Sequence, residues 1–126
     1  MVFLSGCCNL PPEEKVFLEG EKVEIQRMID RDFANNVALD RALIEYKNAF
    51  GKEIVEREFE EVNLNSPLPM KSDDGQEFLW HREVNFLFWD VPEECVTTRI
   101  GLKLRLLLDE DGTVRKKVVS ILSEST

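Results

Sequence analysis

Few residues of this sequence have the types and spacing that catalysis or metal binding requires. His81 is the only histidine, and no cysteine or second histidine lies near it in the sequence to complete a zinc site. Cys95 follows Glu93 and Glu94, whose charges favour the neutral thiol over a nucleophilic thiolate. Residues 109–112 (Asp-Glu-Asp-Gly) are acidic, but an EF-hand alternates its ligands over about twelve residues. We therefore predict no metal, no cofactor and no enzyme activity.

One motif stands near the N-terminus, where Leu4-Ser5-Gly6-Cys7 follows an apolar pair and precedes a proline-containing stretch. These four residues resemble the lipobox of bacterial lipoproteins, in which a cysteine after small residues becomes diacylated and forms the mature N-terminus. The resemblance implies lipid attachment at Cys7, with residues 1–12 as attachment segment and tether. Cys8, rather than the Asp that retains such proteins in the inner membrane of enteric bacteria, favours the outer membrane, facing the periplasm.

The residues before Cys7 are too few for the apolar region of a signal peptide, which spans about 7–15 residues. The lipoprotein interpretation therefore requires coding sequence upstream of Met1. If Met1 is the true start, we expect a cytoplasmic protein.

The overall composition predicts one folded domain, since 126 residues is an ordinary domain size. No stretch approaches the roughly 18 uninterrupted apolar residues of a membrane-spanning helix. A net charge of −9 argues against nucleic-acid binding, which depends on Lys and Arg neutralising phosphates. The three cysteines do not form the framework of a disulfide-rich domain.

The N-terminal half carries a helical pattern, because residues 21–50 lack Gly and Pro and show apolar residues at spacings of three and four. We expect Asn35-Asn36 to be a bend or a tight connection, Gly51 to cap the last turn, and residues 13–18 to form a separate turn ending at Gly20. The two apolar stripes are Ile25, Ile29 and Phe33, and Leu39, Leu43, Tyr46 and Phe50.

The C-terminal half changes to the period of two that is typical of strands. Residues 53–64 fit either a helix or a strand, and we favour a strand; residues 63–75, with Pro67 and Pro69, predict a loop. Residues 109–112 predict a hairpin loop with Gly112 in the left-handed conformation, followed by a returning strand from Val114. The preceding two strands are indicated by Phe78, Trp80, Val84, Phe86 and Phe88, and by Ile100, Leu102, Leu104, Leu106 and Leu108.

These elements predict an α+β fold in residues 13–126, forming a single domain. One long or two shorter N-terminal helices would pack on a meander of three or four antiparallel strands, which buries both apolar faces at once. Cystatin-like and NTF2-like folds have this order of elements, and small lipoproteins of the outer-membrane barrel assembly machinery have a shorter version. These are similarities of architecture alone.

Two surfaces are candidates for partner binding. The first is the face of the predicted strand opposite its aromatic core face, which carries Leu79, Leu87 and Trp89. A sheet covered on one side would expose these three residues, unless a second layer covers them. The last hairpin predicts a basic outer face, the alternative being a solvated face paired with nearby glutamates. Its residues are Arg99, Lys103, Arg105, Arg115 and Lys117.

We interpret the sequence as a lipid-anchored envelope protein whose non-catalytic domain binds another envelope protein or an anionic envelope component. The alternative is a small acidic cytoplasmic protein of the immunity or inhibitor type, suited to a basic toxin. A second alternative is a small-ligand carrier or enzyme of NTF2-like architecture. The oligomeric state is left open.

Overall fold

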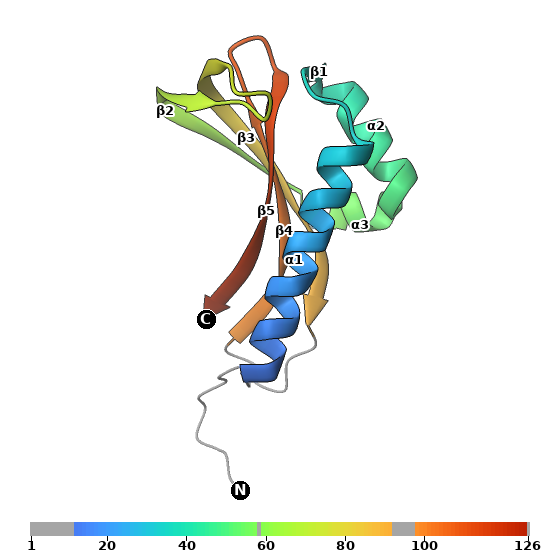
Figure 1. Ribbon diagram of the computed structural model, residues 1–126. Coiled ribbons are helices and arrows are strands. Elements are labelled where there is room, and N and C mark those ends of the chain that lie inside the picture. Colours follow the sequence, from blue (N-terminus) through green and yellow to red (C-terminus); the bar gives the residue numbers. More distant parts are fainter. Residues whose placement is uncertain (1–11, 58, 92–97, 126) are drawn as a thin grey trace, which may run out of the picture.

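A computed structural model describes residues 12–57, 59–91 and 98–125, and it confirms the α+β class. Figure 1 shows the helices on one side of a strongly bent antiparallel sheet. The five-stranded sheet has the order β1-β5-β4-β3-β2. The elements are α1 (Pro12–Asp32), β1 (Val37–Ala38), α2 (Leu39–Phe50), α3 (Lys52–Arg57), β2 (Glu60–Lys71), β3 (Glu77–Val91), β4 (Thr98–Leu108) and β5 (Thr113–Ser125).

Helix α1 is longer than the sequence pattern predicts, because it continues through Gly20. The prediction of a separate turn ending at that glycine was wrong. A glycine costs an exposed helix about 1 kcal/mol relative to alanine. Leu18 and Ile29 are buried in the same core on either side of Gly20, so tertiary packing holds the helix across it.

The connection after α1 is tight, as the Asn35-Asn36 pair predicts. Asn36 has a φ of 59°, a left-handed conformation that asparagine tolerates well. Helix α2 then ends at Gly51, whose φ is 100° and whose N–H donates to the Lys47 carbonyl. Tyr46 on α2 stacks on Phe33, with ring centroids 4.4 Å apart, so both predicted apolar stripes meet in the core.

Residues 53–64, which fit either a helix or a strand by sequence, form part of each. Residues up to Arg57 belong to α3, whose Val55 is buried, whereas β2 begins at Glu60. The preference for a strand was therefore wrong for the first half of this segment and correct for the second.

The prediction of a loop over residues 63–75 was wrong up to Lys71, where β2 ends, and correct for residues 72–75, which form the turn to β3. Pro67 and Pro69 are compatible with this strand because β2 is the edge of the sheet, where a residue without an N–H removes no ladder bond on its outer side. The pairing with β3 is irregular between Asn63 and Leu68, and the turn to β3 contains Gly75 with a φ of 87°.

Strands β3, β4 and β5 form the side of the core that faces the helices. Cross-strand rows place Phe86 opposite Leu104 and Leu104 opposite Val119, and all three are buried. These rows pack against Ile29 of α1 and Tyr46 of α2. Burying apolar side chains in this way contributes about 25 cal/mol per Å² removed from water, which is the main force holding helices to sheet.

Two further irregularities, in the pairings of β4, shift the side-chain alternation along the sheet. The register of β3 and β4 shifts between Leu87 and Trp89, and that of β4 and β5 shifts between Leu107 and Leu108. Each shift adds one residue to one strand, so residues beyond it exchange faces.

Candidate functional site: the outer face of the sheet

The sheet has a second face that no helix of the described residues covers (Figure 1), and we call it the outer face. The strand register defines it, because residues directly opposite each other share a face. Its residues are Leu79, the row Val62, Glu83, Leu107 and Lys116, the row Glu60, Asn85, Arg105 and Val118, and the row Leu87, Lys103 and Ser120.

A polar network lies at the centre of the outer face. Arg105 binds Glu83 through two nitrogens, with Nε 2.6 Å from Oε2 and Nη2 2.9 Å from Oε1. The Asn85 amide also donates to Glu83 Oε2, at 2.6 Å. Glu83 and Asn85 are buried although they do not face the helices. The network is therefore rigid, since a bidentate pair fixes both side chains.

The Glu83 carboxyl is ionised by this arrangement. Burial is the largest single influence and raises its pKa, but the hydrogen bonds and charge of Arg105, together with Asn85, outweigh it. The pKa of Glu83 is therefore below its ordinary value of 4.5, and that of Arg105 is raised. Asn85 Oδ1 is also buried and accepts no hydrogen bond from the described residues.

The apolar part of the outer face differs from the prediction. Leu79 is 47% exposed, as expected of a sheet covered on one side, and Val62, on the same face opposite Glu83, is 43% exposed. Leu87, which the sequence places on the exposed surface, is only 2% exposed and does not belong to the helix-side core. The expectation that it is exposed was therefore wrong.

The five predicted basic residues do not form one face. Lys103 and Arg105 lie on the outer face. Arg115 lies at the register shift near the β4–β5 turn, where its Nε binds Asp109 Oδ2 at 2.8 Å. Lys117 lies opposite Leu106 on the helix side and is 2% exposed, so its assignment to an exposed basic surface was wrong.

The buried Lys117 is held by the end of α1 and by the β2–β3 turn. Its ammonium donates to the Phe33 carbonyl at 2.8 Å, just beyond the C-terminus of α1, where the helix dipole favours a cation. Asp73 Oδ2 lies 4.0 Å away. Burial is the main influence on both groups, lowering the pKa of Lys117 despite the opposing charge of Asp73, and raising the pKa of Asp73.

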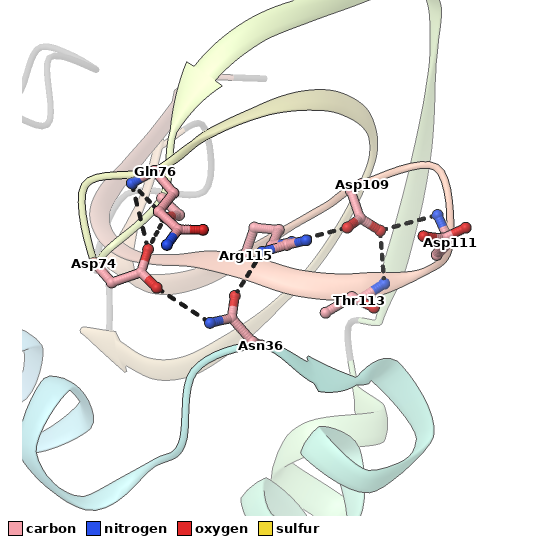
Figure 2. A network of polar contacts seen from close by, with 8 residues as sticks. Asn36, Asp74, Gln76, Asp109, Asp111, Thr113 and Arg115 are labelled. Carbon is pink, nitrogen blue, oxygen red and sulfur yellow. Dashed lines mark hydrogen bonds and ion pairs between the residues drawn. The ribbon is translucent and has the colours of Figure 1, made fainter.

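A second network, shown in Figure 2, joins the loops at one end of the sheet. Asp109 Oδ1 accepts the backbone N–H groups of Asp111 and Thr113, which closes the β4–β5 turn. Gly112 in this turn has a φ of 80°, as predicted. Arg115 also donates to Asn36 Oδ1 at 3.0 Å, and the Asn36 amide donates to Asp74 Oδ2 in the β2–β3 turn. The network therefore fixes three loops, and we assign it a structural role.

Sequence reasoning did not identify one group of polar atoms on β3. Trp80 Nε1, His81 Nε2 and Arg82 Nε are buried and have no hydrogen-bond partner among the described residues. His81 was expected to face solvent, but it is half-buried. Its neighbours lie opposite Leu68 and Asn63, on either side of the irregular stretch of β2. No sequence signal could locate these atoms, because the burial of their side chains depends on tertiary packing.

Some predicted residues fall outside what the structure describes. These are Cys7 and the side chains of Trp89 and Arg99. In backbone register, Trp89 lies opposite Leu102 after the shift in β3. Within the described ranges, no helix is long and apolar enough to cross a membrane, and no group of three metal-binding side chains occurs.

Comparison with models of protein families, with curated proteins and with solved structures gives no significant match to this chain.

Proposed function

We propose that this protein is held in the cell envelope by acylation of Cys7, and that its domain binds another envelope protein through the outer face. The proposal includes no catalytic step. Leu4-Ser5-Gly6-Cys7 supports the attachment, and a diacylated cysteine supplies the two acyl chains that stable anchoring requires.

The observation that carries the binding proposal is the combination of exposed apolar residues and an ordered ion pair on an uncovered face. Leu79 and Val62 offer apolar area to a partner. On the same face, Arg105 and Glu83 are already fixed in one geometry, so binding costs little side-chain entropy there. Interfaces of soluble proteins commonly combine a small apolar centre with such fixed polar groups.

The charges on the outer face suggest the kind of surface that fits it. Lys103, Arg105 and Lys116 lie on β4 and β5, whereas Glu60 and Glu83 lie on β2 and β3. A partner with acidic groups facing β4–β5 and an apolar group facing Leu79 would complement this division. Such complementarity selects partners and orientation more than it raises affinity.

Attachment is tested by labelling whole cells with a palmitate analogue. We expect label on the natural chain, including any sequence encoded upstream of Met1, and none on Cys7→Ala. The matched control is Cys8→Ala, which keeps the attachment cysteine and should retain the label. Equal labelling of the natural chain and Cys7→Ala would refute the anchor.

Binding is tested separately with a photoreactive amino acid at Leu79 and, as control, at Ile44. Ile44 is 60% exposed on α2, on the helix side of the molecule, and is therefore at least as accessible as Leu79. We expect a discrete adduct in cells only from position 79, weakened by Arg105→Ala. Adducts of equal yield from both positions, or from neither, would rule out the outer face as the binding surface.

A further inference from the structure

The two edges of the sheet differ in how they are protected from pairing with another strand. Exposed edge strands present unpaired N–H and C=O groups, and proteins block them with prolines, charges and bulges. The β2 edge has all three: Pro67 and Pro69, an irregular register after Asn63, and an acidic pair at Glu60 and Glu61. This edge is therefore unsuited to adding a strand.

The first half of the β5 edge is occupied by this chain itself. Strand β1 pairs with Thr113 and Val114. The Asp73 N–H donates to the Arg115 carbonyl, and Asp73 Oδ2 accepts the N–H of Lys117. Gln26 of α1 then donates to the Lys117 carbonyl at 2.9 Å and accepts the Val119 N–H at 2.8 Å. These bonds also show that odd-numbered residues from 115 onward direct their backbone groups away from β4.

The second half of the β5 edge lacks the prolines of β2 and the intramolecular partners of the first half, and Glu124 is its only charged residue. By the same alternation, the backbone groups of Ile121 and Ser123, the Val119 carbonyl and the Ser125 N–H point outward, and no described residue bonds to them. The segment contains no proline and no lysine. Figure 1 shows this end of β5 at the margin of the sheet, diverging from the N-terminal part of α1.

We propose that residues 119–125 pair antiparallel with the same segment of a second copy of this chain, with Leu122 opposite Leu122 of the second copy. The pairing is isologous and joins the two five-stranded sheets into one continuous sheet. It uses the edge of the sheet and leaves the outer face free, so it does not depend on the proposed function.

The register follows from the alternation and from Gln26. Only registers that place odd residues opposite odd residues align the outward N–H and C=O groups. Centring the pair on Ile121 would require the Val119 N–H, which Gln26 already occupies. Centring it on Ser123 would place Leu122 opposite Glu124.

Centring the pair on Leu122 avoids both conflicts. Ile121 exchanges two hydrogen bonds with Ser123 of the second copy, and by symmetry Ser123 exchanges two with Ile121 of the second copy. The Ser125 N–H of each copy donates to the Val119 carbonyl of the other. Glu124 then lies opposite Ser120, so the two acidic positions do not face each other, which like charges on opposed strands would disfavour. The segment is thus complementary to itself in this register.

Association is tested on the full chain by sedimentation over a concentration series from about 10 μM to 1 mM, a range that covers micromolar dimers. We expect the mass to rise from 14.6 kDa towards twice that value. Ser123→Pro removes an outward N–H without touching the β4 ladder and should weaken the dimer at least tenfold, because two intermolecular hydrogen bonds are lost. Ser123→Ala keeps the N–H and should dimerise like the natural chain. A mass of 14.6 kDa throughout, or equal dimerisation of the Pro and Ala variants, would overturn the proposal.

A disulfide test checks the register and does not depend on how well the proline variant folds. In a chain with its three cysteines changed to Ser, Leu122→Cys should oxidise to a covalent dimer. Non-hydrogen-bonded antiparallel partners lie about 4.5 Å apart between Cα atoms, within disulfide range. Ser120→Cys is the control, because its two copies would lie roughly 13 Å apart along the strands. No dimer from position 122, or equal yield from position 120, would refute the register.

Discussion

Gln26 joins helix to sheet through two hydrogen bonds, and removing them is the sharpest test of how this fold is held together. Its side-chain amide satisfies the Lys117 carbonyl at 2.9 Å and the Val119 N–H at 2.8 Å, in the position that a neighbouring strand would otherwise take. Gln26→Leu deletes both bonds, together with an exposed bond from the amide to Asp30 Oδ1, and keeps the helix, since glutamine and leucine have similar helix propensities.

The expected magnitude follows from the two bonds. Each contributes about 1 kcal/mol net, and the site is partly buried, so water only partly replaces them. We expect Gln26→Leu to lower the free energy of unfolding by about 2 kcal/mol, which for a chain of this size corresponds to a fall in Tm of roughly 6–10 °C. Urea denaturation followed by circular dichroism measures the change directly.

Two further variants make the measurement specific. Arg27→Leu changes the exposed neighbouring position of α1 and should stay within about 0.5 kcal/mol of the natural chain. Gln26→Glu keeps an acceptor for the Val119 N–H, but its carboxylate cannot donate to Lys117 until it is protonated. Its deficit should therefore shrink at acidic pH. The reasoning is refuted if Gln26→Leu is as stable as Arg27→Leu.

Three other predictions follow from single groups. Tyr46→Phe should leave the free energy of unfolding unchanged or raise it by up to about 1 kcal/mol, because the tyrosine hydroxyl is buried with no partner among the described residues. Thermal unfolding measures this, and a decrease of more than about 1 kcal/mol would show that the hydroxyl makes a stabilising hydrogen bond. Asp109→Ala should lower the free energy of unfolding by about 3 kcal/mol, because alanine loses both turn hydrogen bonds and the ion pair with Arg115. Asp109→Asn should lower it less, and equal losses for the two variants in urea unfolding would contradict this reasoning. The pKa of Asp109 lies below its ordinary 3.8, because the Arg115 pair and the turn N–H groups outweigh burial, the largest single influence, which raises it. The stability it contributes is therefore present above pH 3.8 and lost as the pH falls through the lower folded pKa, so the gap between the natural chain and Asp109→Asn should close in acid and stay constant above that pH.

The candidate binding surface could be predicted only in part. The alternation of side chains along β3 correctly predicted that Leu79 is exposed. The same alternation along β4 correctly predicted that Lys103 and Arg105 face away from the helices. The Glu83–Arg105–Asn85 network was not foreseen, because its members lie on two strands and meet only through the register. Lys117 was misplaced for a related reason, since one added residue at Arg115 reverses the faces that follow it.

Local pattern was sufficient where a segment had one dominant period. The apolar stripes on α1 and α2, the two long strands after Glu77, and the turn with Gly112 at positive φ all follow from side-chain spacing and backbone sterics that neighbouring residues fix. The end of β2 did not follow, because its prolines are acceptable only on an edge strand, and a local pattern does not say which strand is the edge.

The sequence by itself therefore determined the apolar stripes of α1 and α2, the main strands and the α+β class, because these depend on interactions within a few residues. Only the tertiary structure decided which face each residue joins, how Gly20 stays within α1, and how Lys117 becomes buried at the end of that helix. Those outcomes depend on strand pairing and on packing between segments far apart in the chain, where one added residue changes the environment of every residue after it.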